Sequence, residues 1–128
     1  EIGYDELVYL QQHKTGAHIK ASCLMGAIIG GADEDMQKKL ELYAKNIGLA
    51  FQIKDDILDV EGDGDILGKP IGSDEECGKS TFVTVCGLEK SKEMVKELSQ
   101  EAADAVSGIN EYGDFLAWLA IWLAERNH

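Results

Sequence analysis

Three aspartates, Asp55, Asp56 and Asp59, are the residues of this sequence best suited to do chemistry. On a helix, Asp55 and Asp59 would lie one turn apart on the same face, and Gln52 would precede them on that stripe. Carboxylates this close repel one another, and near a helix C-terminus the macrodipole disfavours each negative charge by roughly 0.3–1 kcal/mol. A divalent cation would reverse both effects, because hard oxygen ligands suit Mg²⁺. Spacing alone leaves two interpretations open: a metal site, or a solvated end of an acidic helix.

Composition limits the possible partners. The chain has 128 residues, 45% of them hydrophobic, and a net charge of −12, which fits one domain or part of a larger one. The negative charge argues against nucleic acid and anionic membranes, which would be repelled, and is compatible with bound cations. Three cysteines without metal-ligand spacing predict reduced thiols and a cytoplasmic protein. The longest apolar runs, 21–32 and 115–124, are too short to span a bilayer, so we expect no membrane insertion.

Helical apolar spacing and a single proline predict an all-α fold. We expect helices over residues 4–30, 34–60, 80–108 and 115–126, with Asp33 as the N-cap of the second. The second half of that helix is apolar on more than one face, which predicts a central position. The aspartates would then project from a buried helix into an adjoining cavity, a common way to build metal sites in helical bundles.

Glycines and lysines mark two further features. Gly16 lies inside the first predicted helix, where glycine costs about 1 kcal/mol relative to alanine. Close approach of a ligand or of another backbone would justify it, and a tolerated kink would explain it equally well. Lys69 and Lys79 bracket a glycine-rich segment after the aspartates, which suggests an anion held against a metal. The alternative is a surface loop with incidental lysines.

Two phosphate- or metal-binding loops are disfavoured in that segment. Asp59 and the acidic residues after it imitate the start of an EF-hand calcium loop, but Pro70 stands where the bidentate glutamate should be. A Walker phosphate loop is excluded because five residues rather than four separate Gly72 from Gly78, and no strand precedes them.

Four ordered segments together resemble a known family: KTG at residues 14–16, FQIKDDILD at 51–59, LGKPIGSD at 67–74 and KST at 79–81. The chain resembles the C-terminal half of a trans-isoprenyl diphosphate synthase of the polyprenyl synthetase family, over essentially its whole length. Residues 59–63 and 87–90 most resemble the bacterial farnesyl diphosphate synthase branch. Four motifs in order are far more specific than any one of them.

The resemblance implies a fold and a reaction. The fold would be an all-α helical bundle of the isoprenoid synthase type, with residues 1–128 forming the C-terminal half of its single domain. The reaction would be prenyl transfer, in which isopentenyl diphosphate attacks the carbocation left when an allylic diphosphate ionises. The full-length parent would be a cytoplasmic homodimer that uses Mg²⁺.

The resemblance also assigns roles to residues. Asp55, Asp56 and Asp59 would form the second Asp-rich motif, with Asp55 and Asp59 as the direct Mg²⁺ ligands. The residues implied to bind substrate are Lys14, Lys69 and Lys79, which would contact the allylic diphosphate, and Thr15 and Gln52, which would line the cavity near the reacting carbons. Lys14, Thr15 and Gln52 are also the expected catalytic residues.

Parts of the family's active site have no counterpart in this sequence. The first Asp-rich motif and the Lys, Arg and His cluster for isopentenyl diphosphate are absent, and Arg126 is the only arginine. We therefore interpret the chain as part of a longer enzyme, inactive alone, with apolar faces such as 47–51 exposed. One alternative is a non-catalytic regulatory or partner subunit of the same fold, which would more often have lost the aspartates. A plain acidic interaction module would leave the ordered motifs unexplained.

Overall fold

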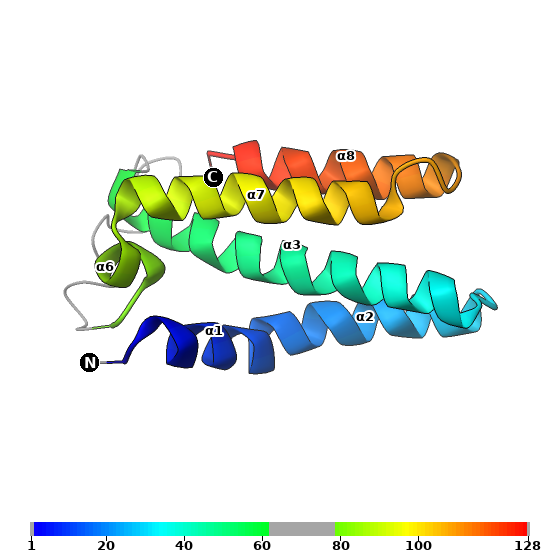
Figure 1. The fold of residues 1–128 in the computed structure, drawn as a ribbon, viewed down its shortest axis with the longest axis horizontal. Coiled ribbons are helices and arrows are strands. Elements are labelled where there is room, and N and C mark those ends of the chain that lie inside the picture. Colours follow the sequence, from blue (N-terminus) through cyan, green and yellow to red (C-terminus); the bar gives the residue numbers. More distant parts are fainter. Residues whose placement is uncertain (1, 62–78, 128) are drawn as a thin grey trace.

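Six helices make up the part of the chain that the computed structural model describes, residues 2–61 and 79–127. They are α1 (Tyr4–His13), α2 (Thr15–Ile29), α3 (Glu34–Glu61), α6 (Phe82–Cys86), α7 (Leu88–Val106) and α8 (Glu111–Glu125). In Figure 1, α1 and α2 run along one edge, α3 lies in the middle, and α7 and α8 run along the opposite edge. No strand occurs in these ranges, so the all-α prediction is confirmed.

Helix α3 is the central element, as the sequence predicts. Asp33 caps its N-terminus, because its Oδ1 accepts a hydrogen bond of 2.8 Å from the Met36 amide. Of the described helices, α7 and α2 make the most extensive contacts with α3. The expectation that residues 47–51 are exposed is therefore wrong, since Ile47, Leu49 and Ala50 are all buried.

The first predicted helix is interrupted, contrary to expectation. The backbone leaves helical geometry at Lys14 (φ −103°, ψ −97°), which separates α1 from α2. The break lets α1 pack against both α3 and α6 while α2 packs along α3. Beside the break, Gly16 meets Gly48 of α3, where an added Cβ would lie 3.3 Å from the Gly16 Cα. An added Cβ on Gly16 itself would lie 3.1 Å from the Gln11 carbonyl oxygen of α1. Close approach of the α1 backbone at the break therefore accounts for glycine at residue 16.

The third predicted helix is also two helices, because Gly87 adopts a positive φ of 84° between α6 and α7. Glycine reaches that region without the steric cost other residues incur. Thr81 caps α6, its Oγ1 accepting a hydrogen bond of 3.1 Å from the Thr84 amide. Residues 80–81 and 107–108, predicted to be helical, lie outside both helices.

The last helix starts at Glu111 rather than at residue 115 as predicted. Asn110 is its N-cap, with Oδ1 accepting hydrogen bonds of 3.0 Å from the Tyr112 and Gly113 amides. Within this helix Gly113 lies against α7, and an added Cβ there would be 2.4 Å from the Val106 carbonyl oxygen. Only glycine therefore fits at this contact.

Two hydrophobic clusters divide the interior along α3. The aspartate-end core comprises Leu7, Leu49, Ile53, Ile57, Phe82, Met94 and Val95. The turn-end core comprises Tyr43, Ile47, Ala102, Ala103, Val106 and Ala120. The polar contacts at the turn-end core run from α3 outward: Tyr43 donates to the Leu116 carbonyl (3.0 Å), and the Asn46 amide donates to Glu101 (3.0 Å).

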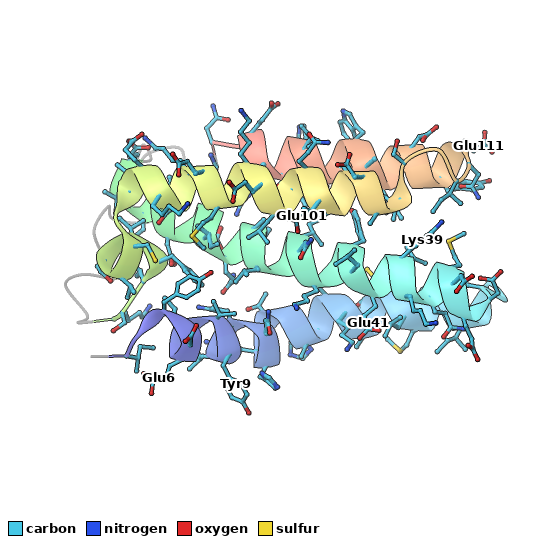
Figure 2. The ribbon with its side chains drawn as sticks, viewed as in Figure 1. Glu6, Tyr9, Lys39, Glu41, Glu101 and Glu111 are labelled. Atoms are coloured by element: carbon cyan, nitrogen blue, oxygen red, sulfur yellow. The ribbon has the colours of Figure 1, made fainter. Side chains whose placement is uncertain are left out.

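Large apolar side chains remain exposed on the outer helices. Tyr9 is 65% exposed on α1 and Ile29 is 87% exposed on α2. Figure 2 shows Glu6 and Tyr9 directed away from the rest of the bundle. Within the described residues, no helix has the length and apolarity that crossing a membrane requires.

Candidate functional site

The close approach of α2 and α3 brings two of the sequence motifs together. The Thr15 hydroxyl donates a hydrogen bond of 3.4 Å to Gln52 Oε1, although the two residues are 37 positions apart. Gln52 lies one helical turn after Gly48, so the contact of Gly48 with Gly16 holds Thr15 beside it. Lys14 is exposed at the junction of α1 and α2, next to Thr15. Three predicted site residues, Lys14, Thr15 and Gln52, thus lie where the start of α2 meets α3.

The aspartate cluster (Asp55, Asp56 and Asp59) follows one turn later on α3. The side chains have different environments. Asp55 is 41% exposed and forms an ion pair with Arg126. Asp56 Oδ2 accepts a buried hydrogen bond of 2.7 Å from the Phe82 amide. Asp59 is buried, with 2% of its surface exposed.

Asp56 attaches α6 to α3. Its partner, Phe82, is the first residue of α6 and is fully buried, and a hydrogen bond to a carboxylate is about twice as strong as one between neutral groups. The Phe82 ring also meets Tyr4 of α1 edge-on, with centroids 6.2 Å apart. Lys79 is exposed three residues before Phe82. The attachment of Phe82 therefore limits how far Lys79 can lie from α3.

Arg126 is a site residue that sequence reasoning missed. It follows α8, and its guanidinium lies 4.2 Å from the centroid of the Phe51 ring while pairing with Asp55. Burial lowers the pKa of Lys54, and the nearby positive charge of Arg126 lowers it further. The only available signal was that Arg126 is the sole arginine of the sequence. Nothing local to residue 126 indicates a contact with a residue 71 positions away.

The chemistry of these residues fits a magnesium ion in part. Across residues 2–61 and 79–127, no group of three or more His, Cys, Asp or Glu side chains converges to hold a metal ion by itself. Mg²⁺ does not require such a cage, since it usually takes one or two carboxylates together with water and substrate phosphates. The Asp55 carboxylate is 41% exposed and pairs with the Arg126 guanidinium, so a metal ion there would replace one cation with another. Lys69, the remaining predicted diphosphate contact, lies outside the described residues.

An all-α bundle with a cluster of carboxylates on its central helix is typical of helical proteins that bind metal ions. Sequence comparison identifies the family within that class. The chain matches the family model described as "Polyprenyl synthetase" over residues 3–113. It therefore belongs to the polyprenyl synthetase family.

Individual relatives agree with this assignment. The chain is 41% identical to a farnesyl diphosphate synthase of Micrococcus luteus, over 96% of this chain and 42% of the relative. It is 40% identical to geranylgeranyl pyrophosphate synthase 4 of Arabidopsis thaliana, over 100% of this chain and 35% of the relative. Relatives named for products of different length are thus equally similar to this region.

A solved structure adds a bound ligand to the comparison. The geranyltransferase of Helicobacter pylori, "complexed with magnesium and isoprenyl diphosphate", matches with a TM-score of 0.75 and 31% identity, over 95% of this chain and 40% of that one. The chain thus spans about two fifths of the length of this neighbour and of the two relatives.

Proposed function

We propose that this chain is the C-terminal half of a trans-isoprenyl diphosphate synthase and binds the diphosphate of the allylic substrate. The observation that carries the proposal is the Thr15–Gln52 contact, which joins two separate family motifs one helical turn from Asp55. The bound ligands named for the Helicobacter pylori relative support the same assignment. Because a chain of net charge −12 repels a diphosphate, binding requires cations at the site.

Binding would rest on cations placed around the diphosphate. Three lysines, the exposed Lys14 and Lys79 together with Lys69, would contact it as point charges. Asp55 and Asp59 would hold Mg²⁺, while Asp56 keeps α6 in place through Phe82. Mg²⁺, when bound, would stabilise negative charge on the departing diphosphate.

The reaction proposed for the whole protein separates charge. The C–O bond of the allylic diphosphate breaks, and its electron pair leaves with the diphosphate. The alkene of isopentenyl diphosphate attacks the carbocation, and loss of a proton yields a chain five carbons longer. The Thr15 hydroxyl donates a hydrogen bond to Gln52, so its oxygen lone pairs would be free to stabilise the cation. Such prearranged dipoles need no reorganisation as charge develops.

Catalysis would require more than this chain. Holding two substrates in attack geometry accounts for roughly 7–11 kcal/mol of barrier lowering, and the binding cluster for isopentenyl diphosphate has no counterpart in the sequence. We therefore expect no prenyl transfer by the 128 residues alone, and activity as a homodimer at full natural length. Elongation of an allylic diphosphate by the purified 128-residue chain would contradict this part of the proposal.

Metal and diphosphate binding at Asp55 tests the proposal directly. In the protein at full natural length, Mg²⁺ with inorganic diphosphate should raise the melting temperature more than either alone, because ligands that bind only the folded state stabilise it. Asp55→Asn should abolish the joint effect and lower turnover by on the order of 10²-fold. Asp104→Asn is the matched control, since Asp104 is an exposed acid on α7 that pairs only with Gln100 among the described contacts.

The possible outcomes separate the candidate functions. Loss of the joint thermal effect in Asp55→Asn but not in Asp104→Asn supports the proposed site. No Mg²⁺-dependent diphosphate effect in the unmodified protein would overturn it. Diphosphate binding without turnover would instead identify a non-catalytic partner subunit of the same fold.

A further inference from the structure

The guanidinium of Arg126 is held on two sides by α3. It pairs with the Asp55 carboxylate and lies 4.2 Å from the centroid of the Phe51 ring. Phe51 and Asp55 are four residues apart, so they present one face of the helix. The Arg126 side chain is only 10% exposed, whereas that of Asp55 is 41% exposed. The cation is therefore enclosed, while the carboxylate that it binds remains accessible.

The rest of the fold fixes the position of Arg126. Its amide donates a hydrogen bond of 3.1 Å to the Trp122 carbonyl, which continues the hydrogen bonding of α8. Helix α8 is in turn attached to α3, because the Tyr43 hydroxyl donates to the Leu116 carbonyl. Figure 1 places the C-terminus near the end of α3 that carries the aspartate cluster. Arg126 thus reaches Asp55 from a packed helix.

A metal ion at Asp55 would meet this guanidinium. Both cations seek the same carboxylate oxygens, and two positive charges a few ångströms apart in a partly desolvated site repel strongly. In the absence of metal, Arg126 also offsets the repulsion among the clustered carboxylates. One carboxylate thus has two alternative counter-ions, of which one is covalently part of the chain.

We propose that Arg126 is a positioning residue that competes with the metal for Asp55 and so sets the metal affinity of the site. This inference rests on the proposed function, because it takes Asp55 to be a metal ligand. While Arg126 holds Asp55, only the fraction of molecules with the guanidinium displaced binds metal, and the apparent affinity falls by that fraction. Coupling is reciprocal, so metal bound at Asp55 releases Arg126 from α3.

The test measures metal binding rather than turnover. Mn²⁺ is titrated into the protein at full natural length with inorganic diphosphate present, and free Mn²⁺ is followed by electron paramagnetic resonance. Arg126→Gln removes the competing charge and should tighten Mn²⁺ binding on the order of tenfold, the equivalent of one moderately desolvated cation–π contact. Arg126→Lys keeps the charge without the planar group over Phe51 and should give an intermediate affinity.

Lys92→Gln is the matched control for loss of one positive charge. Lys92 pairs with Glu61 and Glu89 near the same end of α3 and makes no described contact with the aspartate cluster. Its replacement should leave Mn²⁺ affinity within about twofold, because exposed ion pairs are worth little. Equal tightening in Lys92→Gln and Arg126→Gln would overturn the proposal, since general electrostatics would then explain both.

Two further outcomes separate this inference from the proposed function. Unchanged or weaker Mn²⁺ binding in Arg126→Gln, with normal binding in the unmodified protein, would overturn the competition and leave the diphosphate site standing. No Mn²⁺ binding by either protein would overturn both. As an independent readout, the Arg126 Nε–H resonance, assigned by its loss in Arg126→Lys, should shift on Mg²⁺–diphosphate addition and stay in place with diphosphate alone.

Discussion

Around Tyr43 and Asn46, α3 meets its neighbours through neutral side chains that each donate one hydrogen bond to α8 or α7. Around Asp55, the same helix carries three carboxylates that repel one another. Two of them have partners from elements far along the chain: Asp56 accepts from the amide of Phe82, and Asp55 pairs with the guanidinium of Arg126. The turn-end half of α3 thus carries packing contacts and none of the predicted site residues.

The aspartate-end half gives up part of that stability. Like charges and a helix C-terminus both disfavour the aspartate cluster, so the half depends on α6 and on the last residues of the chain to hold it. The comparison teaches that one helix separates its structural and chemical roles along its length. Four substitutions test that separation, in order of decreasing effect on stability.

Gly113→Ala should cause the largest loss, at the turn end. The added methyl would lie 2.4 Å from the Val106 carbonyl oxygen, which belongs to the backbone and moves only with α7. We expect the free energy of unfolding to fall by about 3 kcal/mol, measured by urea denaturation. Gly26→Ala is the control, because nothing lies within 4 Å of its added methyl, and it should gain about 0.5–1 kcal/mol. Equal effects would show the turn-end core to be loosely packed.

Asp56→Ala should be the costliest change within the aspartate cluster. It removes the acceptor of the buried Phe82 amide, and an unsatisfied buried donor costs about 1–3 kcal/mol. Asp56→Asn keeps an oxygen acceptor without the charge and should lose about half as much. The measurement is the same urea denaturation, and hydrogen exchange at Phe82 should speed up in the alanine variant. A stable Asp56→Ala protein would mean that α6 is held by other contacts.

Tyr43→Phe should have a smaller effect whose sign depends on pH. Burial, and secondarily the neighbouring Cys23, raise the pKa of Tyr43 to about 12. The folded state then keeps the Tyr43 proton between pH 10 and 12 while the unfolded chain releases it, so this contribution is complete below pH 10 and is lost as pH rises to 12. At pH 8 the variant should lose about 1 kcal/mol with its hydrogen bond.

Urea denaturation at several pH values checks this sign. The advantage of the unmodified protein over Tyr43→Phe should shrink by up to about 3 kcal/mol between pH 10 and 12 and then reverse. A difference that is constant with pH would show that the Tyr43 hydroxyl is not shielded from water.

Asp55→Asn should change stability least. It relieves repulsion within the aspartate cluster but loses the pair with Arg126, and an ion pair whose carboxylate is 41% exposed is worth about 1 kcal/mol at most. We expect a net change near zero, in contrast to Asp56→Ala, and a small gain would fit the relief of repulsion. A loss of more than about 2 kcal/mol would place Asp55 among the structural residues and weaken the comparison.

Periodicity and capping residues predicted the central helix well. Residues 34–60 were expected and Glu34–Glu61 is observed, because apolar spacing and Asp33 mark both the face and the start. Gly87 and Asn110 are residue types that favour a helix break and a helix N-cap. The sequence prediction passed over both, because the apolar spacing continues on either side of them. The break at Lys14 had one local signal, the nearby Gly16, but its position follows from how α1 and α2 each pack on other helices.

The candidate site divides in the same way. Motif order identified Lys14, Thr15 and Gln52, and the contact between Thr15 and Gln52 agrees with that grouping. The partners of Asp56 and Asp55 could not be predicted from the sequence, because Phe82 and Arg126 lie 26 and 71 residues away from them. Only the folded chain determines which carboxylate faces which partner.

In evolutionary terms, the meeting of Gly16 with Gly48 links two positions that could otherwise drift separately. A side chain at residue 48 would first encounter the Gly16 Cα at 3.3 Å and then Ile19. Enlarging residue 48 pushes α2 away from α3, whereas a side chain at residue 16 would first meet the Gln11 carbonyl oxygen at 3.1 Å. The two positions are in contact, and the effects of substitutions at such neighbours do not simply add. The spacing between Thr15 and Gln52 depends on the close approach of these two glycines.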